Sequence, residues 1–288
     1  MQIVNDFKEY KILDLNDGRK LESWNGVILD RPDPEVIWSS NVSDKWSKAD
    51  AKYIRSDKGG GSWKMYNNIP GTWQIHYKDL TFNLKLMGFK HTGLFPEQAL
   101  NWTYLIDLIR SEKREVKVLN LFAYTGAASV ACLSAGASVV HVDSSRGMVD
   151  WAKENVKASN LEEAKIRYIV DDVKKFVKRE MRRGNKYDII IMDPPSFGRG
   201  SNGEVWSIEN DLFELVSNCA SLLSDEPLLF LINSYTTGLS MSVLENILKL
   251  TVNKVHPGVI VKDELGLKVE NSDIVLPCGI FARWQNNK

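Results

Sequence analysis

The residues most suited to chemistry lie in the segment 192–198, which reads Met-Asp-Pro-Pro-Ser-Phe-Gly. Asp193 supplies a fixed hydrogen-bond acceptor, and Phe197 supplies a flat apolar face. Pro194 has no N–H group and stiffens the backbone, so that nearby carbonyl oxygens stay available to a ligand. An acceptor beside an aromatic face suits a flat, nitrogen-bearing substrate such as a nucleic-acid base taken out of its stack. A proline-rich turn with a buried Phe is the structural alternative.

Two further acidic positions fit an adenosine. Asp143, followed by Ser144, stands where a carboxylate can accept hydrogen bonds from both ribose hydroxyls. Asp172 could accept the amino hydrogens of adenine while the backbone at Val173 offers an N–H to a ring nitrogen. Each acid could instead cap the helix that follows it or interact with the helix dipole. The sequence therefore predicts a nucleoside-binding edge, with helix capping as the alternative.

A single glycine marks the turn before the first of these acids. Gly126, preceded by Tyr124 and Thr125, allows a tight turn and a close approach of the backbone to a ligand. The segment lacks the G-x-G-x-x-G set that usually accompanies a dinucleotide pyrophosphate, which disfavours a nicotinamide or flavin cofactor. A plain corner between a strand and a helix is the alternative interpretation.

These positions must be brought to one edge by the surrounding elements. After residue 90 the apolar pattern predicts alternating strands and helices, with two late strands near 259–261 and 274–283. Such an order predicts an α/β fold with a mostly parallel sheet and helices on both faces, in which ligands bind beyond the carboxyl ends of the strands. The predicted strands are 117–121, 138–142, 165–170, 188–192 and 228–232, and the predicted helices are 127–135, 147–159, 173–183, 211–223 and 240–252.

The first part of the chain has a different pattern and predicts a small β-rich N-terminal module over 1–88, followed by the α/β domain over 89–288. Trp73, Ile75 and Tyr77 alternate with polar residues and predict a β-hairpin with the apolar positions of 80–86. The polar stretch 39–62 predicts a mobile loop.

Composition limits the classes of function. The 288 residues include 37 Lys+Arg and 37 Asp+Glu, and this zero net charge excludes binding to polyanions by bulk charge. A basic run at 174–186 could hold RNA phosphates, but a solvated helix face is the ordinary interpretation. Three scattered cysteines, four scattered histidines and no long apolar run or signal core predict a cytoplasmic protein with no metal site, no disulfide framework and no membrane segment.

The four motifs at 122–126, 142–143, 171–173 and 193–197, in this order, resemble class I S-adenosylmethionine-dependent methyltransferases, which have a Rossmann-like sheet. They are most similar to the bacterial family that methylates large-subunit ribosomal RNA at cytosine C5 or guanine N7. The resemblance implies an enzyme that uses S-adenosyl-L-methionine and acts on RNA. It also implies cofactor contacts at Tyr124, Thr125, Gly126, Asp143, Ser144, Asp172 and Val173.

In that family a Lys-Thr-Gly segment, followed by Asp-Gln-Arg, folds over the cofactor. Here the corresponding residues 91–93 read His-Thr-Gly, and 97–99 read Glu-Gln-Ala. The resemblance implies that Phe95 and Gln98 contact the cofactor, whereas Ala99 replaces the family's Arg.

The acceptor atom decides which side chains catalysis needs. Methylation of cytosine C5 requires a thiolate, and the segment 232–236, where the cytosine-specific members carry it, has no cysteine. We therefore expect methylation of a base nitrogen, with Asp193, Pro194 and Phe197 orienting the acceptor. The alternatives are a methyltransferase for a small molecule or a protein side chain, and a non-catalytic RNA-binding protein on the same fold.

Overall fold

The computed structural model describes residues 1–40, 43–56, 60–200 and 203–287. The chain forms two compact units. Unit 1 comprises Met1–Leu100 and Leu265–Cys278, and unit 2 comprises Asn101–Glu264 and Gly279–Lys288. The predicted domains 1–88 and 89–288 stay a prediction.

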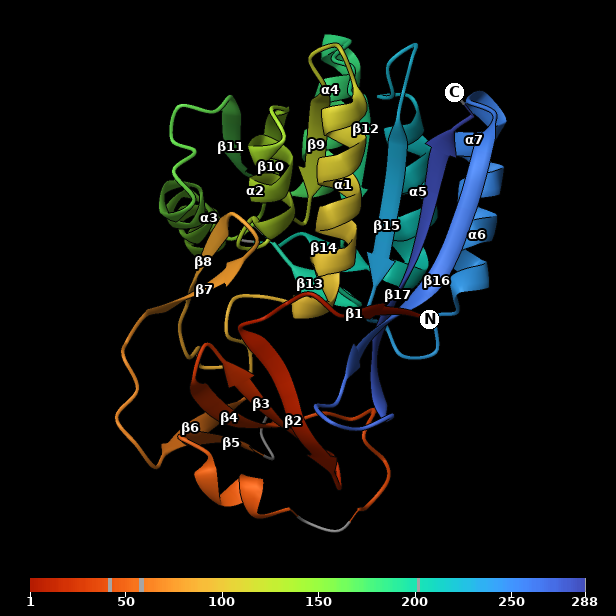
Figure 1. Cartoon of the computed structure of the whole chain (residues 1–288). Coiled ribbons are helices and arrows are strands. Elements are labelled where there is room, and N and C mark those ends of the chain that lie inside the picture. The colour runs from red at the N-terminus through yellow and green to blue at the C-terminus, as the bar shows by residue number, and fades with distance from the viewer. Residues whose placement is uncertain (41–42, 57–59, 201–202, 288) are drawn as a thin grey trace. The chain divides into compact units, whose positions relative to one another are not determined.

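Unit 2 is built on a mostly parallel sheet, which confirms the predicted α/β fold (Figure 1). Its central strand β9 is flanked on one side by β10 and β11 and on the other by β12 and β15, and these five strands are parallel. The antiparallel strand β17 pairs with β15, and β16 follows it. The strands are β9 (Lys117–Leu121), β10 (Ser138–Asp143), β11 (Ile166–Val170), β12 (Ile189–Met192), β15 (Leu229–Ser234), β16 (Gly258–Lys268) and β17 (Val275–Asn286). Residues 265–268 of β16 and 275–278 of β17 belong to unit 1.

Helices cover both faces of this sheet (Figure 1). The helix α1 was not predicted, although Trp102, Leu105, Ile106 and Ile109 are buried with helical spacing. No described helix is long and apolar enough to cross a membrane. The helices are α1 (Ala99–Ser111), α2 (Ala127–Ser134), α3 (Arg146–Ala158), α4 (Val173–Arg183), α5 (Ile208–Ala220), α6 (Met241–Leu250) and α7 (Val252–Val255).

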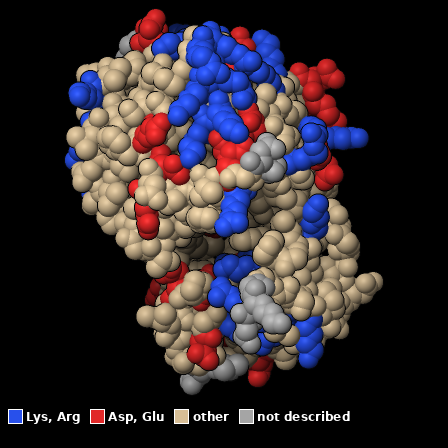
Figure 2. Space-filling model, turned by 180° about the vertical axis from the view of Figure 1, so that it is seen from behind, with Lys and Arg blue, Asp and Glu red and all other residues tan. Residues whose placement is uncertain are grey.

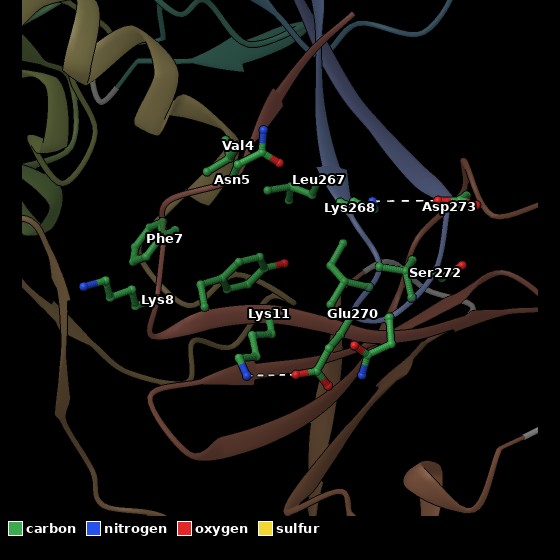
Figure 3. Close-up of a pocket in the computed structure, with 14 residues that line it drawn as sticks. Val4, Asn5, Phe7, Lys8, Lys11, Leu267, Lys268, Glu270, Ser272 and Asp273 are labelled. Atoms are coloured by element: carbon green, nitrogen blue, oxygen red, sulfur yellow. Dashed lines mark hydrogen bonds and ion pairs between the residues drawn. The ribbon is translucent and has the colours of Figure 1, made fainter.

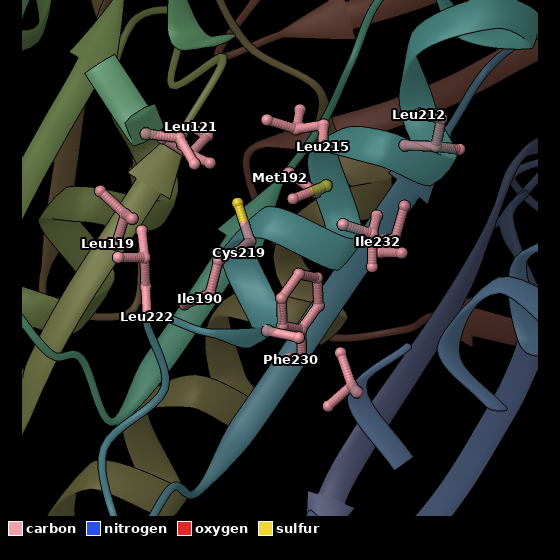
Figure 4. Close-up of a cluster of buried hydrophobic side chains, with 14 of the residues drawn as sticks. Leu119, Leu121, Ile190, Met192, Leu212, Leu215, Cys219, Leu222, Phe230 and Ile232 are labelled. Atoms are coloured by element: carbon pink, nitrogen blue, oxygen red, sulfur yellow. The ribbon is translucent and has the colours of Figure 1, made fainter. Parts of the chain in front are cut away.

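The apolar core of unit 2 lies between the sheet and the helices α4–α6 (Figure 4). Alternate residues of three adjacent strands point into it, because side chains of a strand alternate between its faces. They are Leu119 and Leu121, Ile190 and Met192, and Phe230 and Ile232, and they pack against Leu212, Leu215, Cys219 and Leu222. This core fixes the strands, and therefore the loops that leave their carboxyl ends.

Unit 1 contains a five-stranded sheet in the order β2-β3-β4-β5-β6, the separate hairpin β7–β8, and β1 (Gln2–Val4), which pairs with β16 at Leu265–Leu267. The predicted hairpin of Trp73 and Ile75 is confirmed. Two-residue turns with positive φ, Asp17-Gly18 and Asn25-Gly26, join the first three strands of the sheet. The strands are β2 (Tyr10–Asn16), β3 (Arg19–Trp24), β4 (Val27–Pro32), β5 (Ala51–Arg55), β6 (Gly61–Met65), β7 (Trp73–Tyr77) and β8 (Leu80–Leu84).

The prediction of a mobile loop over 39–62 is wrong where the stretch forms regular structure, at 44–48, 51–55 and 61–62. The stretch contains the 3₁₀ helix η1 (Asp44–Lys48), the strand β5 and the start of β6. Ala51 and Tyr53 point inward from β5, and their period of two is concealed by the charged residues between and after them. The parts of the predicted loop at 41–42 and 57–59 lie outside the described residues.

Candidate functional site

The turn from β9 to α2 has an unusual backbone. Phe122 and Tyr124 adopt left-handed φ values of 53° and 50°, and Gly126 follows with 83°. A Cβ atom at Gly126 would lie 2.8 Å from Cβ of Ala152 in α3 and 3.3 Å from Cε1 of His141. Left-handed conformations cost free energy in residues other than glycine and gather at functional sites. The predicted tight turn is therefore present, and only a glycine fits at its end.

Asp143 is held at the end of β10 by two backbone donors. The N–H of Tyr124 donates to Oδ2 and the N–H of Ser145 donates to Oδ1, each at 2.9 Å. Burial raises the pKa of Asp143, although these two hydrogen bonds oppose the shift. Each carboxylate oxygen can accept a further hydrogen bond, so the side chain can still bind a pair of hydroxyls. Ser144 is exposed beside it.

Asp172 caps the helix α4. Its Oδ1 accepts a hydrogen bond from the N–H of Lys175 at 2.9 Å, which is the structural alternative given above. Val173 is buried. The preceding acid, Asp171, pairs with Arg179, and its N–H donates to the carbonyl of Asp143 at 3.1 Å. The loops after β10 and β11 are therefore adjacent, while contact of Asp172 with adenine stays a prediction.

The segment after β12 exposes its aromatic ring. Phe197, at the start of β13 (Phe197–Arg199), is 58% exposed, so the alternative of a buried Phe is wrong. Pro194 is buried. The carbonyl of Pro195 accepts the indole N–H of Trp206 at 2.6 Å, and the carbonyl of Ser196 accepts the N–H of Ile208 at 3.0 Å. Two of the carbonyls in this proline-rich turn are therefore bound within the protein.

Further contacts join the strand ends of unit 2. The ring of Trp206 in β14 (Val205–Ser207) packs on Phe122 with the centroids 4.9 Å apart, which links the loops after β9 and β12. The hydroxyls of Ser196 and Thr236 lie 2.7 Å apart and link the loops after β12 and β15. The predicted residues of unit 2 thus follow adjacent strands along one edge of the sheet.

A buried amide pair at this edge was missed in the sequence. Nδ2 of Asn101 in α1 donates to Oδ1 of Asn233, at the end of β15, over 3.0 Å. The segment 232–236 contains no cysteine but does contain this asparagine. Its abrupt change from apolar to polar residues directly after a strand is the signal that could have indicated Asn233.

A polar network lies beneath the glycine turn. Nδ2 of Asn120 donates to Oγ of Ser129 at 2.9 Å, and that Oγ lies 3.0 Å from Nδ1 of His141. Asn155 donates to the carbonyl of Thr125 at 2.8 Å and ties the turn to α3. Burial lowers the pKa of His141 to about 4, so the ring is neutral at physiological pH. These buried contacts stabilise the turn.

Phe95 and Gln98 belong to unit 1. Phe95 precedes the short 3₁₀ helix η2 (Pro96–Gln98), and its carbonyl accepts the N–H of Gln98 at 3.1 Å. Gln98 is 7% exposed, and the ring of Phe95 lies 5.9 Å from that of His91. The contact of these two residues with a cofactor stays a prediction.

A hollow of about 650 Å³ lies in unit 1 between the start of the chain and the turn of β16 and β17 (Figure 3). Two of its lysines have carboxylate neighbours, with Lys11 2.8 Å from Glu270 and Lys268 3.8 Å from Asp273. Its lining runs over residues 4–12 and 267–273 and includes none of the predicted site residues. We therefore place the candidate site at the strand ends of unit 2 and not here.

The basic run on α4 is compensated by acids. Lys174 lies 2.9 Å from Asp211, Lys178 lies 3.2 Å from Glu214, and Lys175 pairs with Glu204. Figure 2 shows Lys and Arg gathered on one face of unit 2 with Asp and Glu beside them. A solvated, ion-paired helix face explains this run without RNA. Among the described residues, no group of three or more His, Cys, Asp or Glu could hold a metal ion.

The chain is similar to known methyltransferases. The family model of S-adenosylmethionine-dependent methyltransferases matches residues 50–249. The chain is 36% identical over 145 residues to the ribosomal RNA large subunit methyltransferase K/L of Shewanella frigidimarina, covering 50% of this chain and 20% of that one. It is 32% identical over 174 residues to the protein of the same name from Pseudoalteromonas atlantica, covering 60% of this chain and 24% of that one. The chain thus spans about a quarter or less of these curated relatives.

A solved structure covers nearly the whole chain. The crystal structure of the SAM-dependent methyltransferase from Agrobacterium tumefaciens is 35% identical, with a TM-score of 0.93, and covers 98% of this chain and 92% of its own. With the family match over 200 of 288 residues, this likeness shows that the chain belongs to the S-adenosylmethionine-dependent methyltransferases.

Proposed function

We propose that this protein transfers a methyl group from S-adenosylmethionine to a nitrogen atom of a base in RNA, and that the RNA is ribosomal. The observation that carries the proposal is the exposed ring of Phe197, which lies three residues after Pro194 in the segment that follows β12. An exposed aromatic face offers a surface on which a base can stack.

The strand-end residues of unit 2 fit the cofactor. The backbone donors of Tyr124 and Ser145 orient both oxygens of Asp143, which leaves each of them able to accept one ribose hydroxyl. Gly126 presents bare backbone where a side chain would collide with α3. In this proposal Asp172 and Val173 lie at the adenine edge, and Phe95 and Gln98 also contact the cofactor. The sulfonium of S-adenosylmethionine supplies an electrophilic methyl group when bound, and the protein has to position the acceptor in line with it.

The cysteines of the chain argue against a carbon acceptor. Burial raises the pKa of Cys132, Cys219 and Cys278, so that each stays a thiol near neutral pH. Attack on C6 of cytosine needs a thiolate, because the neutral thiol is a poor nucleophile. A ring or exocyclic nitrogen carries its own lone pair and needs only to be held, by Asp193 and the carbonyl of Pro194.

The relatives support RNA as the substrate. The proteins from Shewanella frigidimarina and Pseudoalteromonas atlantica are named as methyltransferases of large-subunit ribosomal RNA. Ribosomal RNA as substrate also implies that the protein works in the cytoplasm.

The test uses S-adenosylmethionine with a labelled methyl group, offered with large-subunit ribosomal RNA, free nucleosides, small metabolites or a protein mixture. We expect label in the RNA, and mass analysis of its nucleosides should give a methylated base nitrogen. Recovery of 5-methylcytosine would overturn the choice of acceptor atom, and label only in metabolites or protein would overturn RNA as substrate.

A matched pair of variants tests the aromatic face. Phe197→Ala should lower kcat/KM for RNA about tenfold or more, because stacking on an aromatic ring contributes about 1–3 kcal/mol per base. Phe213→Ala on α5 removes a ring that is 50% exposed and should leave kcat/KM unchanged. Equal losses in both variants would remove the special role of Phe197.

A further inference from the structure

The segment 85–98 of unit 1 follows the strand β8, ends with η2, and contains Phe95 and Gln98. Two of its backbone hydrogen bonds lie between residues 85 and 92. The N–H of Lys85 donates to the carbonyl of Thr92 at 3.2 Å, and the N–H of Met87 donates to that of His91 at 3.3 Å. These bonds close a turn, and Nζ of Lys90 donates to the carbonyl of Pro32 at 3.4 Å.

Three side chains of the five-stranded sheet attach this turn by donating to its carbonyls. Nη1 of Arg31 donates to Lys90 at 2.8 Å, Nε1 of Trp63 donates to Met87 at 2.8 Å, and the hydroxyl of Tyr53 donates to Gly88 at 3.3 Å. The donors come from β4, β5 and β6, which are neighbours in the sheet. Tyr53 and Trp63 also contact each other edge to face, with ring centroids 5.3 Å apart.

Arg31 is itself held in one orientation. Its Nε donates to Oε2 of Glu22 at 2.6 Å and its Nη2 to Oε1 at 2.8 Å. Tyr10 donates to Oε1 from the other side at 2.5 Å, and the guanidinium lies 5.2 Å from the ring centre of Trp24. Two parallel hydrogen bonds fix the plane of a guanidinium, so they also fix the direction in which Nη1 points. A lysine at this position has no such fork.

We propose that Arg31, fixed by Glu22, and Trp63 are positioning residues that hold the turn at Met87–Lys90 and thereby order the cofactor-contacting residues Phe95 and Gln98. This inference rests on the proposed function, in which those two residues contact S-adenosylmethionine. A segment that is ordered before binding does not have to be ordered by the ligand, so the cofactor binds more tightly. The N-terminal sheet then serves cofactor binding, whether or not it touches RNA.

The experiment compares Arg31→Lys and Trp63→Phe with the control Trp73→Phe in the full chain. Trp73 donates its indole N–H to the carbonyl of Trp24 at 3.0 Å, so the control also loses one bond to a carbonyl of unit 1 but leaves the segment untouched. Hydrogen exchange of peptides covering 86–98 reports order in the segment. Calorimetry with S-adenosylhomocysteine, which lacks the transferable methyl group, reports cofactor affinity.

We expect faster exchange in 86–98 and a dissociation constant raised about tenfold in Arg31→Lys and Trp63→Phe, the effect of one hydrogen bond. Trp73→Phe should show neither change. With saturating cofactor, kcat should be restored, which a general loss of structure would not allow. Trp63→Phe keeps the pair of Glu22 and Arg31 intact, so it stays informative if Arg31→Lys unfolds.

Unchanged cofactor affinity in both variants, or unchanged exchange in 86–98, would overturn the inference. Failure of the proposed function has a different signature, because the unaltered protein would then give no heat with S-adenosylhomocysteine. In that case the exchange measurement alone still decides whether Arg31 and Trp63 hold the segment.

Discussion

The two units differ in how charged side chains are arranged around their sheets. In unit 2 an apolar core packs against the sheet, and acids such as Asp143 and Asp193 lie at the ends of strands. Unit 1 carries ion pairs inside its sheet, where Glu22 is 2.6 Å from Arg31 and Lys20 is 3.1 Å from Asp33. Glu22 has no exposed surface and Arg31 is 6% exposed. In unit 2 these acids therefore lie at the strand ends, where the cofactor is proposed to bind, whereas in unit 1 Arg31 donates to the carbonyl of Lys90 and so holds the protein's own backbone.

The largest expected effect on this difference between the units comes from removing the carboxylate of Glu22. Removing one partner of a buried pair leaves the other charge unpaired, which costs about 3–5 kcal/mol of the free energy of unfolding. We expect Glu22→Ala to be destabilised by this amount in denaturant unfolding. Glu214→Ala in unit 2 breaks an exposed pair with Lys178 and should cost less than about 1 kcal/mol.

Equal losses from Glu22→Ala and Glu214→Ala would mean that the charges of unit 1 are solvated in solution, and the contrast between the units would fail.

The same contrast explains which elements could be predicted from the sequence. In unit 2 the strand 117–121 and the helix 173–183 were predicted with the bounds that the structure has. In each element the apolar residues have the spacing of a single type of secondary structure, and polar residues follow where that spacing ends. The strand β3 reads Arg-Lys-Leu-Glu-Ser-Trp, and its inward charges conceal the period of two. The Asp17-Gly18 and Asn25-Gly26 turns were the remaining signal for this sheet.

The candidate site shows the same limit. The acids at the ends of β10, β11 and β12 could be placed, because their positions follow from the order of strands and helices. The contact of Asn101 with Asn233 joins residues 132 positions apart, and that of Trp206 with Pro195 depends on the short strands β13 and β14. Neither pairing leaves a periodic pattern in the sequence, since each depends on how distant elements pack.

The second prediction concerns the glycine turn of unit 2. Gly126→Ala adds a Cβ atom 2.8 Å from that of Ala152 at a φ of 83°. Strain and overpacking together should cost about 2–4 kcal/mol in the free energy of unfolding and weaken cofactor binding. Gly136→Ala, with a φ of 92° but open space around it, isolates the strain and should cost about 1–2 kcal/mol. Equal costs at both positions would show that the turn is not pressed against α3.

The third prediction is a pH dependence that differs between the buried groups of the two units. Burial lowers the pKa of His141 in unit 2 from 6.5 to about 4, so the unfolded chain takes up a proton first as the pH falls. Stability from this group is full above pH 6.5 and is lost towards pH 4, at most about 3 kcal/mol.

Glu22 in unit 1 titrates in a lower window. Burial alone would raise its pKa, but Arg31 and Lys20 hold it at about 2. Its stability contribution is present above about pH 4.3 and is lost as the pH falls towards 2.

The two groups can be separated by measuring the free energy of unfolding from pH 7 to 3. Between pH 6.5 and 4 it should fall less steeply in His141→Asn than in the unaltered protein, because the titration of His141 is then absent. Identical slopes would contradict a neutral His141 beneath the turn.

The smallest effect concerns Asp143, whose removal should change ligand binding more than folding. Asp143→Asn keeps the size of the side chain but replaces one acceptor oxygen by a donor, which then faces the N–H of Tyr124 or of Ser145. The dissociation constant of S-adenosylhomocysteine should rise about tenfold, or about 1.4 kcal/mol, because one ribose hydroxyl loses its acceptor. Asp150→Asn on the exposed face of α3 changes the same net charge and should leave the dissociation constant unaltered. If both variants bind S-adenosylhomocysteine equally well, the carboxylate of Asp143 only stabilises the turn through the N–H groups of Tyr124 and Ser145. The acid of unit 2 would then hold the protein's own backbone, as Arg31 does in unit 1.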